Sequence, residues 1–592
     1  MKQEQDFIKE AAAYEILELA AKYYAEATAN NEHEIGYTVQ ELIDAGTEAE
    51  IPDEYIQQAM RDLKANKQHN QSNSEKVKVS FNLGVIISLI LISLGAVYLL
   101  KDNLFFANSQ NESANVVEIT PQSKVQLKVL GDTFSGYSTL RNLKFQNTLK
   151  KQNIQLNYAN EFVQQARAKA INTGKTDLIV TTLDQYLTHQ PQGKIVGLID
   201  RTIGADAIVF NNKAYPQLNS LLDLEALIEQ KANQGKWLKI VYAVDTPSEF
   251  LAQVLDTKFD NFQLSNLEIV EVEDSSIAWE TMQQDDEVAL GVLWQPFIAQ
   301  AESQGNTVAL SSDDAPKTIV DIIVASDRIL ANNPQAVTDF ITTYYRIIDS
   351  TLQDSSLLLH QIAIDGKMNP QEAKAVQEGI KFFSSLEAQQ WMDSGILTQR
   401  IKAISSILTL TGKLESIPTD IDNLFTTKHL IPAVERTNSL IANIAVDNPE
   451  LAKKLGGKET EVVQPNISQS QLLKAQDIGN LTVKGEIKFQ TGSAILTTES
   501  ISTLDKLIAE IAEFNPQNIA IQVKGHTSKT GSAAINNKLS QQRAEVVAAK
   551  LKQRNLPHQI VAEGLGFTVP LSRIPAESSL NQRTEIRLVR IK

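Results

Sequence analysis

The chain of 592 residues contains no cysteine. Disulfide bonds, thiol catalysis and cysteine-ligated metal sites are therefore excluded, and the folded parts depend on packing and hydrogen bonding. An excess of positive charge is also absent, because the net charge is -16. Nucleic-acid binding depends on neutralising phosphates with Lys and Arg, so no nucleic-acid partner is expected.

The charge is unevenly distributed along the chain. Residues 1–77 carry 16 Asp and Glu against 7 Lys and Arg, whereas residues 470–592 carry 16 Lys and Arg against 10 acidic residues. An acidic head and a basic tail indicate different surroundings or partners for the two ends. Solubility alone explains the same asymmetry equally well.

One long uncharged stretch divides the chain. Residues 79–100, VSFNLGVIISLILISLGAVYLL, are 22 residues without a charged side chain, and about 20 apolar residues cross a bilayer as a helix. Five cations lie between positions 61 and 78, whereas only Lys101 follows the stretch before Lys124. The positive-inside rule predicts a single-pass inner (plasma) membrane protein with a cytoplasmic N-terminus and periplasmic C-terminal domains.

Before the span, residues 1–65 predict a small helical cytoplasmic head. Apolar residues recur at steps of three and four from Phe7 to Tyr24, and a capping box at Thr38 and Glu41 opens a second helix. Polar linkers are predicted at residues 66–78, 101–123 and 456–470.

Strands and helices alternate through residues 124–455. Apolar runs at 125–131, 177–182, 239–245 and 318–326 read as strands, and 334–353 reads as a long amphipathic helix. Such alternation predicts α/β architecture with largely parallel sheets.

The order and the sequences of these segments resemble those of periplasmic solute-binding proteins of ABC importers, of the nitrate, sulfonate and taurine type. The segments that carry the resemblance are GDTFSGYSTLR, TDLIVTTLDQYL, VYAVDTPSEFLAQVL and VALGVLWQPFIAQA. Phosphate-binding relatives are similar in layout. The resemblance implies two α/β lobes joined by two crossovers that close on a small solute, and an ABC permease or another envelope protein as partner.

In open α/β sheets, ligands bind beyond the carboxyl ends of strands, where helix N-termini suit anions. Residues at those positions are therefore predicted to bind the solute: Thr133, Ser135, Gly136, Tyr137, Thr181, Thr182, Asp184, Asp245, Thr246, Ser248 and Trp294. Each Ser or Thr is also explained as a helix cap. Asp184 and Asp245 would repel an anion, which favours an amine-bearing or neutral solute, or no solute.

Residues 471–592 resemble the OmpA-like domain, a sheet covered by helices in the order β-α-β-α-β. The motifs are GHT at 525–527, LSQQRA at 539–544 and NQR at 581–583. The resemblance implies a site for the diaminopimelate of the peptidoglycan stem peptide. Its predicted residues are Thr527, Ser528, Asn536, Leu539, Arg543, Asn581 and Arg583.

The C-terminal segment departs from the family pattern at two positions. The family's Asp after Gly-His-Thr is Ser528, and the terminal Asn-Arg-Arg reads Asn581-Gln582-Arg583. One carboxylate and one cation of the family pattern are therefore absent, which removes two charged contacts expected for a zwitterionic ligand.

Together these features predict a non-enzymatic, membrane-anchored extracytoplasmic binding protein tethered to peptidoglycan, which delivers or senses a small solute. No catalytic residue, cofactor or metal site is expected. The alternative is a structural linker between inner membrane and cell wall, in which the two-lobed domain has lost its ligand.

Overall fold

The computed structural model describes residues 125–457, 467–483, 487–490 and 492–591, which all fall within the unit Thr120–Lys592. The predicted helical head, the predicted membrane span and the first two linkers lie outside the described residues. Within the described ranges, no helix is long and apolar enough to cross a bilayer.

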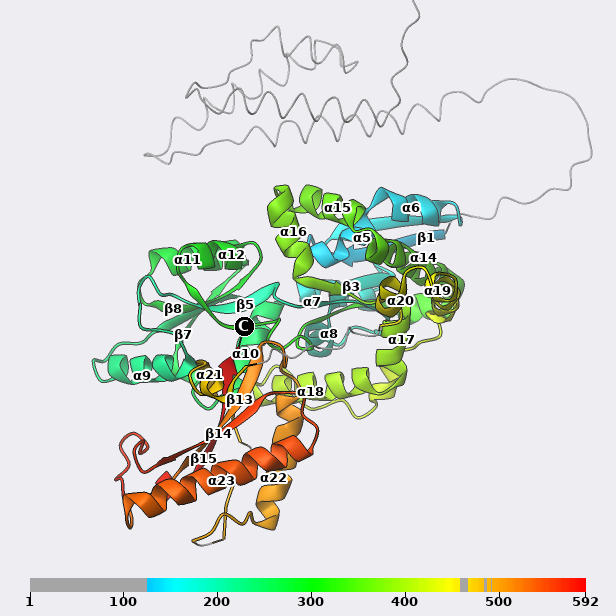
Figure 1. Ribbon diagram of the computed structural model, residues 1–592. Helices are drawn as coiled ribbons and strands as arrows, with labels where there is room; N and C mark the ends of the chain where they lie inside the picture. The colour runs from blue at the N-terminus through cyan, green and yellow to red at the C-terminus, as the bar shows by residue number, and fades with distance from the viewer. Residues whose placement is uncertain (1–124, 458–466, 484–486, 491, 592) are drawn as a thin grey trace, which may run out of the picture. The chain divides into compact units, whose positions relative to one another are not determined.

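The first lobe is built on a six-stranded mixed sheet (Figure 1). Its strands are β1 (Val125–Gly131), β2 (Ile154–Asn160), β3 (Leu178–Thr182), β4 (Gly193–Thr202), β10 (Val320–Ser326) and β11 (Ile380–Phe382). They lie in the order β11-β4-β10-β3-β1-β2. Strand β1 is parallel to β2 and β3, whereas β10 is antiparallel to both β3 and β4.

Helices cover this sheet and supply most of the apolar core of the lobe. They are α5 (Ser138–Arg141), α6 (Leu143–Lys150), α7 (Gln164–Asn172), α8 (Leu183–His189), α13 (Asp327–Asn332), α14 (Pro334–Gln353), α15 (Ser356–Gly366), α16 (Pro370–Glu378), α17 (Ser385–Asp393), α18 (Ile396–Leu410), α19 (Ile431–Ile444) and α20 (Pro449–Leu455). Helix α14 has the predicted bounds. It begins at Pro334, a residue suited to a first turn, and Phe340 and Tyr344 are fully buried on its inner face.

The second lobe contains a five-stranded sheet, also mixed. Its strands are β5 (Asp206–Phe210), β6 (Lys239–Ala243), β7 (Glu268–Val272), β8 (Val288–Trp294) and β9 (Thr307–Ser311), in the order β7-β6-β8-β5-β9. Its helices are α9 (Leu221–Ala232), α10 (Pro247–Lys258), α11 (Ser275–Gln284) and α12 (Phe297–Ser303). The chain passes between the lobes twice, at residues 203–205 and 312–319, which confirms the expected two-lobed arrangement with two crossovers.

The prediction of largely parallel sheets is wrong. In the second lobe β6 is parallel to β7 and β8, but β5 is antiparallel to β8 and β9. The antiparallel pairs involve β4, β5, β9 and β10, the strands that lead into and out of the crossovers. Apolar runs report that a strand is buried on both faces and do not report its direction, so the periodicity could not separate the two cases.

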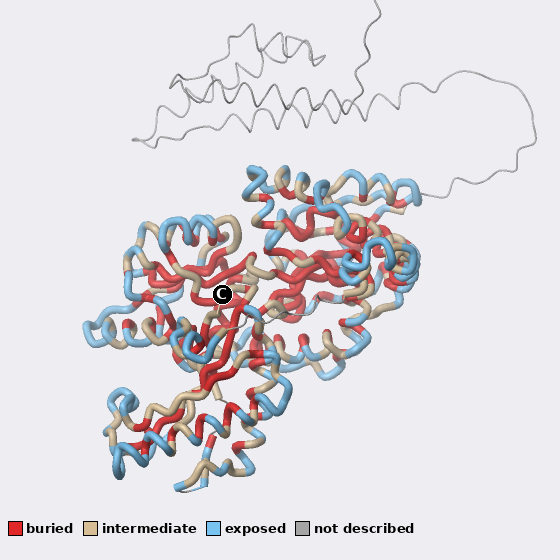
Figure 2. Tube along the Cα trace, viewed as in Figure 1, coloured by how far each residue is buried: buried red, intermediate tan, exposed pale blue. Residues whose placement is uncertain are grey.

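The C-terminal domain is a four-stranded sheet with two long helices. Its elements are α21 (Gln469–Leu473), β12 (Gln476–Asn480), α22 (Thr498–Ile511), β13 (Ile519–His526), α23 (Ala533–Gln553), β14 (Ile560–Gly566) and β15 (Thr584–Arg590), with strand order β12-β15-β13-β14. Figure 2 shows that the buried residues follow the strands, whereas exposed residues follow the outer faces of the helices.

The sequence KGEIKFQ at 484–490 reads as the first strand of this domain. The described residues there contain only an isolated bridge between Phe489 and Leu496. The edge strand is β12, which pairs with β15. Its sequence, QDIGN, is polar and contains glycine, so it lacks the β-branched and aromatic residues by which strands are recognised. Strand β14 was also missed.

Candidate functional site

The loop after β1 is held by a fully buried arginine. Arg167, on α7, forms an ion pair with Asp132 and donates from Nη1 to the Val180 carbonyl at 2.7 Å and from Nε to the Glu161 carbonyl at 2.5 Å. The Arg167 guanidinium therefore bonds to groups inside the protein rather than to a ligand. Among the predicted solute residues of this loop, Thr133 is exposed, whereas Ser135, Gly136 and Tyr137 are buried.

A row of polar side chains crosses the first sheet at the end of β3. Asp321 on β10 is the cross-strand partner of Thr182 on β3 and of Asp200 on β4, so the three side chains share one face. The Tyr137 hydroxyl donates to Asp321 Oδ1 at 2.5 Å. A Cβ placed on Gly136 would lie 2.2 Å from Asp200 Oδ2, so only glycine fits there.

The structure therefore brings Gly136, Tyr137 and Thr182 together around two aspartates that the sequence analysis missed. Both aspartates interrupt apolar strands, in GLIDR and IVDIIV. A carboxylate inside a buried strand is costly to desolvate. An aspartate within an apolar strand was therefore the signal in the sequence that could have revealed this pair.

Burial raises the pKa of several carboxyl groups near this row. It raises the pKa of Asp184 to about 6 and that of Asp206, at the start of β5, to about 7. Burial also raises the pKa of both Asp200 and Asp321. The charge of Asp200 raises the pKa of Asp321 further, whereas a hydrogen bond with Asp321 lowers that of Asp200. Near neutral pH the row therefore carries protons that exposed carboxylates would lose.

The predicted residues of the second lobe lie where β6 leads into α10. Thr246 is the N-cap, since its side chain accepts from the Ser248 amide at 3.2 Å, and Ser248 is fully buried. Asp245 adopts a left-handed backbone with φ of 55°. Its Oδ1 lies 2.8 Å from His189 Nε2 at the end of α8, so this pair connects the two lobes. Trp294 is the cross-strand partner of Asp206 and is half-buried.

Helix α10 also packs into the first lobe. Its residues Phe250 and Val254 belong to the apolar core of that lobe, and Lys413, just after α18, forms an ion pair with Glu249 at 2.5 Å. The two lobes are therefore in contact along α8, α10 and α18.

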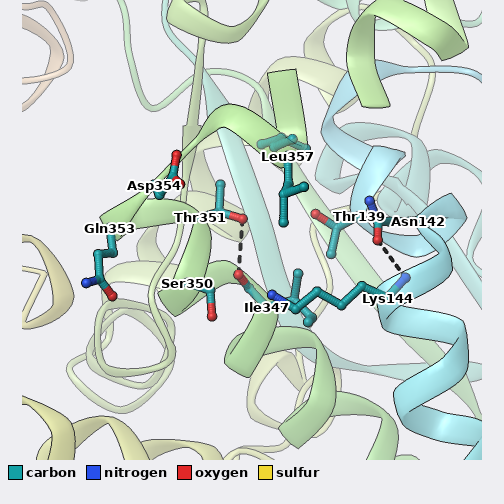
Figure 3. Close-up of a pocket in the computed structure, with 10 residues that line it drawn as sticks. Thr139, Asn142, Lys144, Ile347, Ser350, Thr351, Gln353, Asp354 and Leu357 are labelled. Atoms are coloured by element: carbon teal, nitrogen blue, oxygen red, sulfur yellow. Dashed lines mark hydrogen bonds between the residues drawn. The ribbon is translucent and has the colours of Figure 1, made fainter. Parts of the chain in front are cut away.

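A cavity of about 310 Å³ lies between α5, α14 and α15 of the first lobe. In Figure 3, Thr139 and Leu357 point into it from α5 and α15, and Ile347 and Thr351 line it from α14. None of the predicted solute residues lines this cavity.

The C-terminal domain contains a buried arginine at the centre of its predicted site. Arg543 on α23 donates from Nε to the Ser493 carbonyl at 3.0 Å, and its guanidinium lies 5.0 Å from the centroid of the Phe489 ring. Desolvation lowers its pKa. In the part of the chain that the structure describes, no carboxylate pairs with Arg543.

The two positions that depart from the family pattern contact each other. Gln582 Nε2 donates to Ser528 Oγ at 3.1 Å, and Ser528 Oγ lies 3.0 Å from Thr530 Oγ1. Asn536 donates to the Thr530 carbonyl at 3.0 Å, which joins α23 to this group. A neutral hydrogen-bonded pair therefore stands where the family pattern places a carboxylate and a cation.

The remaining predicted residues of this site have separate roles. Asn581 holds the preceding loop, because its side chain accepts from the Leu571 amide and donates to the Pro575 carbonyl. Arg583 pairs with Glu585 at 2.7 Å. Thr527 is buried, and Leu539 is half-buried on α23. Arg543, Ser528 and Asn536 are buried, with exposed fractions of 6%, 1% and 4%.

Residues 488–583 match the model of the OmpA family. The C-terminal domain is OmpA-like. Over 94 residues the chain is 33% identical to outer membrane protein A of Shimwellia blattae, which covers 16% of this chain and 39% of that protein. The corresponding values for outer membrane protein A of Escherichia coli O157:H7 are 31%, 16% and 27%. The chain thus spans less than two-fifths of the length of these curated relatives.

Solved structures similar to the two-lobed part include the periplasmic aliphatic sulphonate binding protein from Escherichia coli. That match has 14% identity and a TM-score of 0.42, and it covers 51% of this chain and 92% of the other. A desulfurization enzyme, DSZB, matches with 10% identity and a TM-score of 0.39, over 53% of this chain and 99% of the other.

Proposed function

We propose that the OmpA-like domain binds the peptidoglycan stem peptide and tethers the two-lobed domain to the cell wall. The observation that carries this proposal is the buried guanidinium of Arg543, which pairs with no carboxylate in the described ranges. An unpaired buried cation is costly. A carboxylate of the stem peptide would relieve that cost, because the guanidinium fork matches a carboxylate in two parallel bonds.

The ammonium end of diaminopimelate would meet the Ser528 hydroxyl and backbone carbonyls of the same loop. A hydroxyl accepts a hydrogen bond from an ammonium group but contributes no charge. We therefore expect the carboxylate contact with Arg543 to supply most of the affinity, and the ammonium contact to be weaker than in domains that keep the aspartate.

The full chain would then be an inner-membrane protein, with residues 79–100 as the anchor and the remainder in the periplasm. The two-lobed domain would be held between membrane and wall, where it receives a small solute and delivers it to an ABC permease or reports on it. The two short crossovers and the Asp245–His189 pair favour this role, since that pair joins the two lobes. We propose no enzymatic activity.

A structural linker is the second candidate function. The packing of Phe250 and Val254 into the core of the first lobe favours it, because apolar contact between lobes stabilises one arrangement without a ligand. In that case the two-lobed domain acts as a spacer or as a platform for another envelope protein.

Replacing Arg543 with alanine is expected to weaken binding to isolated peptidoglycan by about 10–100-fold, the effect of one lost hydrogen bond to a charged group. The measurement is co-sedimentation of the full chain, in detergent, with purified sacculi. The matched control is Arg554→Ala, because Arg554 caps the same helix but is exposed and paired with Asp505. Equal sedimentation of both variants would show that Arg543 is not the anchor.

Replacing Ser528 with aspartate is expected to strengthen the same binding by roughly fivefold, or about 1 kcal/mol, because it adds a carboxylate opposite the ammonium group. Gln582 already donates to this position, so the new carboxylate keeps one hydrogen-bond donor. Ser528→Asn, which has the same shape without the charge, serves as control. If the aspartate variant binds no better than the asparagine variant, the ammonium group does not lie at Ser528.

A further inference from the structure

Carboxyl groups converge from both lobes beside the two crossovers. Asp200 and Asp321 are 0% and 1% exposed at the first-lobe side, and Asp184 on α8 is 1% exposed. Asp206 begins β5 directly after the first crossover and is 6% exposed. Asp200 and Asp321 influence each other electrostatically, as do Asp206 and Asp184, so the four carboxyl groups form one cluster.

The cluster contains polar atoms that are ready to bind a ligand. Asp200 and Asp321 hydrogen-bond to each other, but both oxygens of Asp200 and Oδ2 of Asp321 receive no bond from an N–H or hydroxyl donor among the described residues. The Thr182 hydroxyl is on the same face as Asp321 and lies toward Asp184. Thr182 is 4% exposed, and its hydroxyl interacts with the Asp184 carboxyl group, whose pKa it lowers. Buried polar groups of this kind are normally satisfied.

The charged groups on the surrounding elements do not neutralise the cluster. Arg167 of α7 is paired with Asp132. Arg201, which follows Asp200 on β4, is paired with Glu387 and lies over the Phe383 and Trp391 rings.

On the side of the second lobe, His189 faces Asp245 and Lys413 faces Glu249. Tyr137 contributes only a hydroxyl, which donates to Asp321. The cluster therefore has several acidic oxygens and no cation of its own within the described ranges.

We propose that this cluster binds a solute through a primary ammonium group, held by Asp200, Asp321 and the Thr182 hydroxyl. The inference rests on the proposed solute binding between the lobes and names the class of solute. An ammonium group has three donors, which match the oxygens of these three side chains. An anion would instead approach four carboxyl groups without a counter-charge, and each of them would have to stay protonated.

Binding of the ammonium group displaces protons. In the free protein the Asp200–Asp321 pair holds protons, because two adjacent buried carboxylates cannot both ionise. The ligand's positive charge replaces these protons, which pass to solvent. Affinity for the amine therefore increases with pH until the pair is ionised in the free protein.

The test uses the full chain in detergent and two panels of probes. The amines are ethanolamine, 1,4-diaminobutane and lysine, and the anions are ethanesulfonate, nitrate and phosphate. We expect an amine to raise the melting temperature, because it binds the folded state. Calorimetric titration in two buffers of different ionisation enthalpy should then show release of at least one proton.

Asp200→Asn is expected to weaken amine binding by about 10–100-fold, whereas the control Asp393→Asn, at an exposed position of α17, should have no effect. If Asp200→Asn does not fold, the release of protons when an amine binds to the unmodified chain tests the inference instead. Binding of an anion in place of the amines would overturn the inference and leave the proposed solute binding intact. If neither the amines nor the anions bind, both the inference and the proposed solute binding are wrong. If an amine binds without proton release, the inference alone is wrong.

Discussion

Replacement of Arg590 with alanine is expected to lower the free energy of unfolding by about 3–5 kcal/mol, the typical effect of removing one partner of a buried ion pair. Arg590, at the end of β15, donates two bonds to the Asp314 carboxylate at 3.0 and 2.9 Å. Asp314 is fully buried in the second crossover, so alanine at position 590 would leave its charge without a counter-charge. The four tryptophans lie between residues 237 and 391, and their fluorescence during urea unfolding reports on the two-lobed domain.

Two further variants separate charge from packing in this experiment. Arg554→Ala removes an exposed pair with Asp505 and should change the unfolding free energy by less than about 1 kcal/mol. The double variant Arg590→Met with Asp314→Asn should recover most of the loss, because it no longer buries an unpaired charge. A loss in Arg590→Ala as small as that in Arg554→Ala would contradict the prediction.

The Arg590 pair belongs to a wider contact between the OmpA-like domain and the crossover. The Asn515 amide donates to the Asp314 carbonyl at 2.8 Å, and Asn518 donates to the Asp313 carboxylate at 2.7 Å. The Phe259 and Phe514 rings meet edge to face at 6.0 Å, and their two domains share one apolar core. The domain proposed to hold the wall is therefore docked on a segment that joins the lobes.

The first lobe reaches the same domain through α18. Arg400 of that helix forms an ion pair with Glu513, beside Phe514. A change in the angle between the lobes would therefore strain or break contacts of the OmpA-like domain. This coupling connects the two proposed sites physically, since solute binding depends on the lobes and wall binding depends on the docked domain.

The sequence was sufficient to predict most strands, helix α14 and the two lobes with two crossovers. These features depend on local apolar patterns and on caps such as Thr246. It was also sufficient for the OmpA-like domain, because specific motifs mark that segment. The model of the OmpA family matches residues 488–583 within it.

The sequence was not sufficient for features that depend on distant pairing. Strand direction follows from the crossovers, and the polar strand β12 forms only because β15 is beside it. Asp200 and Asp321 are 121 positions apart in the sequence and become one pair only when β4 and β10 align. Likewise, nothing local at Asp314 shows that the last strand of the chain supplies its arginine.

Asp206→Asn is expected to stabilise the protein at pH 8 and to leave its stability nearly unchanged at pH 4. Burial raises the pKa of Asp206 in the folded state to about 7, whereas an unfolded aspartate has a pKa of about 3.9. Between these values the folded state keeps a proton that the unfolded state has lost. The free energy of unfolding therefore falls as pH rises from about 4 to about 7.

A difference of about three pKa units corresponds to roughly 4 kcal/mol, which is the largest gain expected for the asparagine variant at pH 8. Asparagine keeps the size of the side chain and cannot ionise, so the pH-dependent penalty at this position disappears. Urea unfolding at pH 4, 6 and 8, followed by tryptophan fluorescence, measures the effect, with Asp393→Asn as the exposed control. Parallel pH profiles for Asp206→Asn and the unmodified chain would mean that Asp206 is ionised in the folded protein. The cluster would then need a cation beside it even without a solute.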